Sequence, residues 1–95
     1  MEYLQTFVIS NFYLKKEIIK VINHSFECKA IYLIEDKGIF LVGGVSKDIM
    51  IYRNDNYECI QTIKDAHDNN IYDFIELKHG SIISCSYKIM EIWSF

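Results

Sequence analysis

The stretch SCSYKIMEIW, residues 84–93, decides the fold, because a similar stretch stands earlier in the chain. The earlier stretch is VGGVSKDIMIY, residues 42–52, and its last residue, Tyr52, lies 41 positions before Trp93. In both stretches small residues and a short polar turn precede a β-prone run that ends on an aromatic residue. A spacing of this size indicates a repeated unit, and an internal repeat constrains the fold far more than the chemistry.

Short runs of β-branched and aromatic residues, bounded by Gly, Asn, Asp and Ser, recur through the chain and are typical of strands. No stretch shows ten or more residues of clean helical period. We therefore expect two units that carry strands in the same order, opened by His24 and His67, 43 positions apart. The expected strands are residues 17–22, 28–34, 38–44 and 48–53, and then 58–65, 70–77, 81–86 and 88–94. Residues 4–14 carry a weaker signal for one further strand.

Length and composition favour one small, soluble, globular domain. The 95 residues are 51% hydrophobic and 24% charged, with a formal net charge of −3. Arg53 is the only arginine, which argues against nucleic acid as a partner, since phosphate binding needs clustered cations. No segment reaches the roughly 20 apolar residues of a membrane helix, and the N-terminus lacks the basic start of a secretory signal. We expect a cytoplasmic protein that does not bind membranes.

The sequence contains no pattern of catalytic or cofactor-binding residues. The three cysteines stand far apart without a CxxC pair, so we expect them to be reduced and half-buried rather than metal ligands. A metal or acid/base cluster at Asp65, His67, Asp68 and Asp73 is the alternative to an ordinary polar loop. No phosphate-binding loop or nucleophile elbow is present. We expect no enzyme activity, no cofactor and no metal.

The repeat resembles that of the WD40 proteins, which opens on Gly-His and closes on Trp-Asp after a segment similar to Ser-Gly-Ser-x-Asp-x-Thr-Ile-x-Ile-Trp. The resemblance covers about residues 16–95: His67 and residues 84–93 carry it in the later unit, and His24 and residues 42–52 in the earlier one. It implies an all-β fold of antiparallel four-stranded blades of a WD40-like β-propeller, about two blades of an incomplete ring. The units are residues 24–63 and, incomplete, 67–95, and residues 1–15 form an extra strand or a lead-in.

The resemblance also implies a buried structural network in each unit, in which a His, a strand Ser or Thr, a turn Asp and the Trp indole are linked. The later unit keeps His67, Ser84 and Trp93, but the turn before residue 88 is too short to hold the Asp. The earlier unit keeps His24 and replaces the Trp with Tyr52. We expect a hydrogen-bonded cluster in the later unit and a dismantled one in the earlier unit.

The resemblance implies a non-enzymatic scaffold for protein–protein interaction. Its contacts would lie on loops between strands, at Lys47, Asp68, Asn69 and Asn70. The partners would be other proteins or further blades, and copies of the chain could complete a ring by pairing residues 17–22 of one copy with residues 88–94 of another. Two alternatives remain open: an accessory propeller piece of a larger catalytic or signalling protein such as a kinase or ubiquitin ligase, and a gene remnant without function.

Overall fold

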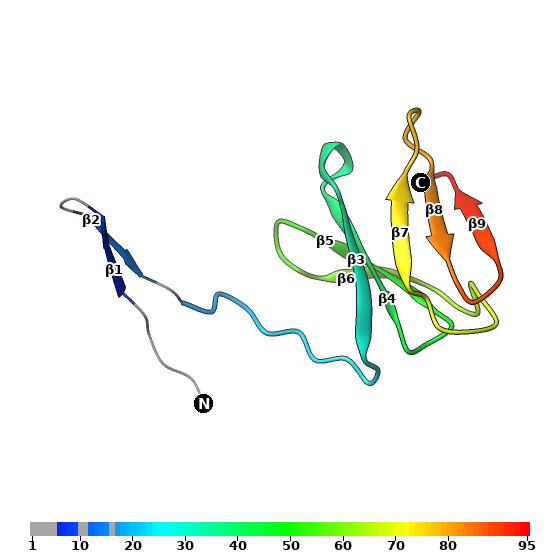
Figure 1. The fold of residues 1–95 in the computed structure, drawn as a ribbon, viewed down its shortest axis with the longest axis horizontal. Helices are drawn as coiled ribbons and strands as arrows, with labels where there is room; N and C mark the ends of the chain where they lie inside the picture. The colour runs from blue at the N-terminus through cyan, green and yellow to red at the C-terminus, as the bar shows by residue number, and fades with distance from the viewer. Residues whose placement is uncertain (1–5, 10–11, 16) are drawn as a thin grey trace.

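The computed structural model describes residues 6–9, 12–15 and 17–95 and consists almost entirely of antiparallel strands (Figure 1). The prediction of an all-β class is confirmed at this level. Within the described residues the strands form one two-stranded, one four-stranded and one three-stranded sheet. The strands are β1 Thr6–Ile9, β2 Phe12–Lys15, β3 Cys28–Ile34, β4 Ile39–Gly44, β5 Ile49–Arg53, β6 Cys59–Ile63, β7 Asp73–Glu76, β8 Ile82–Cys85 and β9 Met90–Trp93.

The N-terminal region differs from the sequence-based expectation. Strands β1 and β2 pair with each other in antiparallel register, whereas one strand was expected over residues 4–14, part of which lies outside the described residues. The strand expected over residues 17–22 is wrong, because this segment forms no strand. A strand requires a hydrogen-bonded neighbour, and Ile18, Ile19 and Val21 are instead 61%, 81% and 64% exposed.

The four-stranded sheet is a simple meander in the order β3-β4-β5-β6. A short 3-10 helix, η1 Glu35–Lys37, connects β3 to β4 and ends at Gly38, whose φ of 66° is the left-handed conformation that glycine adopts without strain. At the other end of β4, Gly44 lies against the backbone of the segment that enters β3, and a Cβ there would collide with the carbonyl oxygen of Glu27. Glycine is therefore required where β3 and β4 meet.

The three-stranded sheet is a second meander, in the order β7-β8-β9. Strand β7 begins at Asp73, three residues later than the pattern predicts, since residues 70–72 belong to the loop from β6. The backbone N–H of Tyr72 still donates to the carbonyl oxygen of Cys85 at 2.9 Å. The two larger sheets thus follow one another along the chain, one within residues 24–63 and the other within 67–95.

One face of each larger sheet is buried against the other sheet. Strands β3 and β7 lie side by side where the two sheets meet (Figure 1). The Tyr32 hydroxyl on β3 donates a hydrogen bond to Glu76 Oε1 on β7 at 2.7 Å. Alternation along each strand sends every second side chain into this interface. The buried residues of the shared core are Ala30, Ile34, Leu41, Ile49, Ile51, Ala66, Ile71, Phe74 and Ile82.

The opposite faces of both sheets carry apolar side chains in contact with solvent. On the four-stranded sheet, Ile31 and Leu33 alternate with the buried residues of β3 and are exposed. On the three-stranded sheet, Ile75, Met90 and Ile92 are exposed, with Met90 at 69% and Ile92 at 66%. The shared core therefore lies between the two sheets. The outer face of the four-stranded sheet is open at β3 but closed at Val42 and Tyr52, which are 2% and 4% exposed.

Candidate functional site

Three side chains that the sequence singled out meet between the sheets. Ser84 lies on β8 and Trp93 on β9, while His67 lies in the loop from β6 to β7. The indole Nε1–H of Trp93 donates to Ser84 Oγ at 2.7 Å, and His67 Nε2 lies 2.6 Å from the same oxygen. His67 is 3% and Ser84 0% exposed, whereas Trp93 is half-buried. The hydroxyl of Ser84 therefore joins the other two side chains.

The hydroxyl of Ser84 accepts the indole proton and is also hydrogen-bonded to the imidazole of His67. A hydroxyl oxygen can accept a second proton or donate its own, so the direction of the bond between Ser84 Oγ and His67 Nε2 depends on the tautomer of His67. Within the described chain His67 Nδ1 is buried and has no hydrogen-bond partner. Glu91 Oε1 lies 3.9 Å from Nε2, a neighbour that the repeat pattern did not reveal.

In the four-stranded sheet, the two side chains that the sequence singled out in the earlier unit contact each other. The Tyr52 hydroxyl lies 3.4 Å from His24 Nε2, and the two rings meet edge to face at 5.7 Å between centroids. Phe40 stacks on Tyr52 with 5.2 Å between ring centroids. Burial, with smaller effects of Cys59 and Cys28, raises the pKa of Tyr52 above its ordinary value of 10.0. Tyr52 therefore contacts residue 24 on the outer face of the sheet.

The predicted protein-binding residues lie together at one end of the two sheets, which we call the loop end: residues 45–48, 64–72 and 86–89. The His67 backbone N–H donates to the carbonyl oxygen of Lys47 at 3.1 Å, joining the first two loops. Ser86 Oγ donates to the carbonyl oxygen of Asn70 at 2.8 Å, joining the third. Lys47, Asp68 and Asn69 are exposed and Asn70 is half-buried. These bonds hold the exposed side chains on a fixed backbone.

A pocket of about 140 Å³ opens at the loop end. Its lining includes positively charged, negatively charged, neutral polar and apolar side chains. Lys88 Nζ lies 5.4 Å from the centroid of the Tyr87 ring. The lining residues are His67, Asp68, Asn69, Ser86, Tyr87, Lys88 and Ile89. The loop end is therefore a polar surface with one shallow depression.

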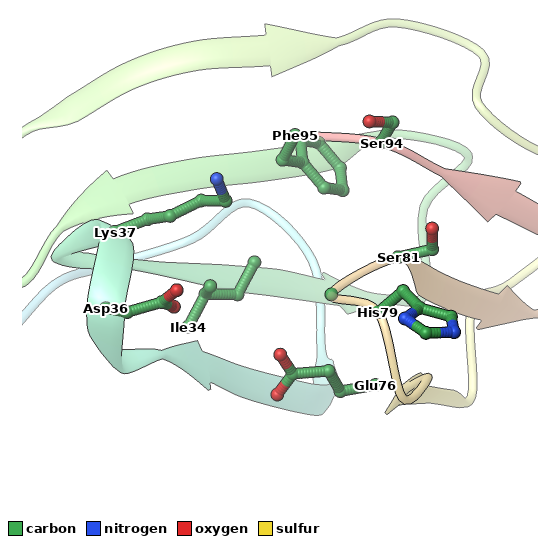
Figure 2. Close-up of a pocket in the computed structure, with 9 residues that line it drawn as sticks. Ile34, Asp36, Lys37, Glu76, His79, Ser81, Ser94 and Phe95 are labelled. Atoms are coloured by element: carbon green, nitrogen blue, oxygen red, sulfur yellow. The ribbon is translucent and has the colours of Figure 1, made fainter.

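The opposite end of the sheets has a larger pocket, of about 230 Å³, that sequence reasoning did not find (Figure 2). It lies between η1 and the turn from β7 to β8, and Asp36, Lys37 and His79 contribute to its lining. Glu76 at its edge already accepts the hydrogen bond of Tyr32, and this bond raises the pKa of Tyr32. These residues come together only because β3 lies beside β7 in the folded chain.

The residues of the alternative metal hypothesis do not form an ion site. Among the described residues, no group of three or more His, Cys, Asp and Glu side chains is placed to hold an ion. Asp65 and Asp68, which the alternative hypothesis used, are exposed, and the Asp65 backbone N–H donates to Asp48 Oδ1 at 2.9 Å. The cysteines are free, and two of them, Cys28 and Cys59, are exposed rather than half-buried as expected.

Comparison of the chain with protein-family models, with curated proteins and with solved structures finds no match. Within the described residues, no helix has the length and apolar character needed to cross a lipid bilayer.

Proposed function

We propose that the chain is a pair of WD40-like propeller blades and acts as a non-enzymatic scaffold for protein–protein interaction. The observation that carries the proposal is the hydrogen-bonded set of His67, Ser84 and Trp93, in the pattern that the WD40 resemblance implies. Two further observations support the proposal. Two antiparallel meanders follow one another along the chain. Their first strands, β3 and β7, lie side by side.

The loop end is the part of the scaffold best suited to contact a partner. It presents Lys47, Asp68 and Asn69 to solvent on loops tied together by backbone hydrogen bonds. Binding residues on rigid β-scaffolds concentrate on such loops, because the sheets fix the positions of the side chains. The mixture of cationic, anionic and amide side chains favours a polar protein surface as the partner.

Further blades, including those of other copies, are the second class of partner. A propeller closes its ring with about four to eight blades, and two larger sheets leave two outer faces open. Exposed Ile31 and Leu33 on one sheet, and Ile75 and Ile92 on the other, give these faces the apolar character of the buried interface. Copies of this chain, stacked sheet on sheet, would complete such a ring.

Quantitative capture of partners from a lysate of the source cells tests the proposal. The bait is the full chain, compared with a loop-end variant, Lys47→Glu with Asp68→Lys, and with a matched control at the opposite end, Asp36→Lys with Lys37→Glu. Each variant pair exchanges one positive and one negative side chain, so the net charge is unchanged. We expect a partner that the wild type and the control retain and that the loop-end variant loses. Capture unaffected by the loop-end variant would contradict the proposal.

A further inference from the structure

One polar atom of His67, the ring nitrogen Nδ1, is buried without a hydrogen-bond partner among the described residues. The other polar atoms of this residue are occupied. Its backbone N–H donates to the carbonyl oxygen of Lys47, and Nε2 lies 2.6 Å from Ser84 Oγ. Glu91 Oε1 lies 3.9 Å from the same Nε2. Because a buried polar atom without a partner costs free energy, Nδ1 is suited to a group that comes from outside the chain.

The pocket of about 140 Å³ at the loop end lies directly beside this ring. His67 lines it together with the turn from β8 to β9, and Figure 1 shows that turn at the same end of the sheets as the loop from β6 to β7. The volume is below the roughly 300 Å³ of sites for drug-sized ligands, so it suits one small group. Tyr87 and Ile89 on the turn are 70% and 48% exposed, and exposed side chains change rotamer within nanoseconds. The pocket therefore gives a small group a route to His67 that leaves the sheets unchanged.

The hydroxyl of Ser84 distinguishes a donor from an acceptor as the incoming group. Among the described residues, Trp93 and His67 are the hydrogen-bond partners of Ser84 Oγ. An incoming donor needs the lone pair of Nδ1, which places the imidazole proton on Nε2. The hydroxyl proton of Ser84, which is 0% exposed, then has no acceptor. An incoming acceptor takes the proton of Nδ1–H, so Nε2 accepts the hydroxyl proton. Of the two, only an acceptor leaves every polar atom of the cluster paired.

The donors around the pocket favour an acceptor that is a carboxylate. Two exposed side chains of opposite charge, Lys88 and Asp68, line the pocket. The ammonium group of Lys88 has donor protons, whereas an ionised Asp68 has none. Hydrogen bonds to an ionised acceptor are roughly twice as strong as those between neutral groups. A carboxylate has two oxygens for the two donors, Nδ1–H and the ammonium group. A phosphate carries more negative charge, which Asp68 would repel more strongly.

We propose that this pocket binds a carboxylate group, which accepts a hydrogen bond from Nδ1 of His67 and is paired with Lys88. The group is carried by an acidic side chain of a partner protein or by a small free anion. This inference rests on the proposed binding role of the loop end and names the chemical group that the loop end recognises. Because the same ring is hydrogen-bonded to Ser84, binding also fixes the positions of the protons in the buried cluster.

Nitrogen-15 NMR of the histidine side chains in the full chain tests the site, with acetate as the probe. The other two histidines, His24 and His79, are internal controls. At neutral pH and constant ionic strength, we expect acetate to change the His67 nitrogen signals saturably and to place a proton on Nδ1. Chloride, and acetamide as the neutral analogue of acetate, should give no saturable change at His67. No response to acetate, an equal response to either control, or an unprotonated Nδ1 in saturating acetate would overturn the proposal.

Two charge variants test the pairing with Lys88. Lys88→Gln removes the ammonium group at the pocket, and Lys37→Gln removes the same charge at the opposite end of the sheets. We expect Lys88→Gln to weaken acetate binding by about 1.5–5-fold, the range for an exposed ion pair. Lys37→Gln should leave the affinity unchanged. Equal acetate affinities of the two variants would overturn the pairing.

Blocked amino acids distinguish the two sources of the carboxylate. Aspartate and glutamate with acetylated amino and amidated carboxyl ends carry the group as a protein does, and blocked asparagine and glutamine are the neutral controls. Tighter binding than that of acetate assigns the site to an acidic side chain, and equal or weaker binding assigns it to a small free anion. Partner capture that depends on the loop end, without any response to carboxylates, would refute this inference alone. A carboxylate response without a captured partner would refute the proposed function alone.

Discussion

Replacing Ser84 with alanine removes the oxygen that is hydrogen-bonded to both His67 and Trp93. Ser84 Oγ accepts the Trp93 indole N–H at 2.7 Å and is hydrogen-bonded to His67 Nε2 at 2.6 Å. Alanine fits the space left by serine, so the packing of the core is retained while both hydrogen bonds are lost. The substitution therefore isolates the polar contribution of the cluster to stability.

The loss of stability in the Ser84→Ala variant depends on how deeply His67 and Trp93 are buried. A buried polar group left without a partner costs about 1–3 kcal/mol. His67 is 3% exposed and cannot regain a hydrogen bond to water, whereas Trp93 is half-buried and regains part of one. We expect Ser84→Ala to lower the free energy of unfolding by about 2–4 kcal/mol. We expect Trp93→Phe, which removes the indole donor and part of the ring that packs against the core, to lower it by at least about 1–2 kcal/mol.

Urea denaturation followed by circular dichroism measures both variants with one probe. The matched control is Ser86→Ala, which removes the single hydrogen bond from Ser86 to the Asn70 carbonyl and should cost about 0.5–1.5 kcal/mol. We expect the loss to be largest for Ser84→Ala. A free energy of unfolding for Ser84→Ala within about 0.5 kcal/mol of the wild type, the range of neutral surface substitutions, would refute the reasoning.

Three further outcomes are expected. Gly44→Ala should leave the chain largely unfolded by circular dichroism, because the new Cβ meets the Glu27 carbonyl oxygen, which belongs to the backbone and cannot move aside. Leu41→Ala should lower the free energy of unfolding by about 2–5 kcal/mol in urea titration, since it empties a fully buried core position. Because burial raises the pKa of Tyr52 above 10.0, its neutral form stabilises the fold fully below pH 10. This contribution is lost as pH rises through the folded-state pKa, and Tyr52→Phe should weaken the fall in stability above pH 10.

Local patterns in the sequence were sufficient to predict most strands. The strand predicted over residues 28–34 has the observed bounds, because its β-branched and aromatic residues are delimited by clear turn signals. Tyr52 and Trp93, which are 41 positions apart, lie at the last position but one of β5 and at the last position of β9. The resemblance to the WD40 repeat singled out His67 and Ser84, although the 2.6 Å contact between them depends on the tertiary structure.

The prediction failed where pairing depends on a neighbour that the sequence does not specify. Residues 17–22 have the composition of a strand, yet they pair with none of the described strands and form no strand themselves. The sequence also singled out His24 and Tyr52, but the 3.4 Å contact between their side chains depends on the tertiary structure. The pocket beside η1 was missed because it depends on how β3 and β7 adjoin.

The proton of the Trp93 indole tests the central claim most directly. Trp93 is the only tryptophan, so the chain gives one indole N–H resonance, and its assignment is unambiguous. If His67, Ser84 and Trp93 form the blade-like cluster, this proton exchanges slowly with solvent and shows nuclear Overhauser contacts to the β-protons of Ser84. An indole proton that exchanges at the rate of a free tryptophan and shows no contact to Ser84 or His67 would contradict the account.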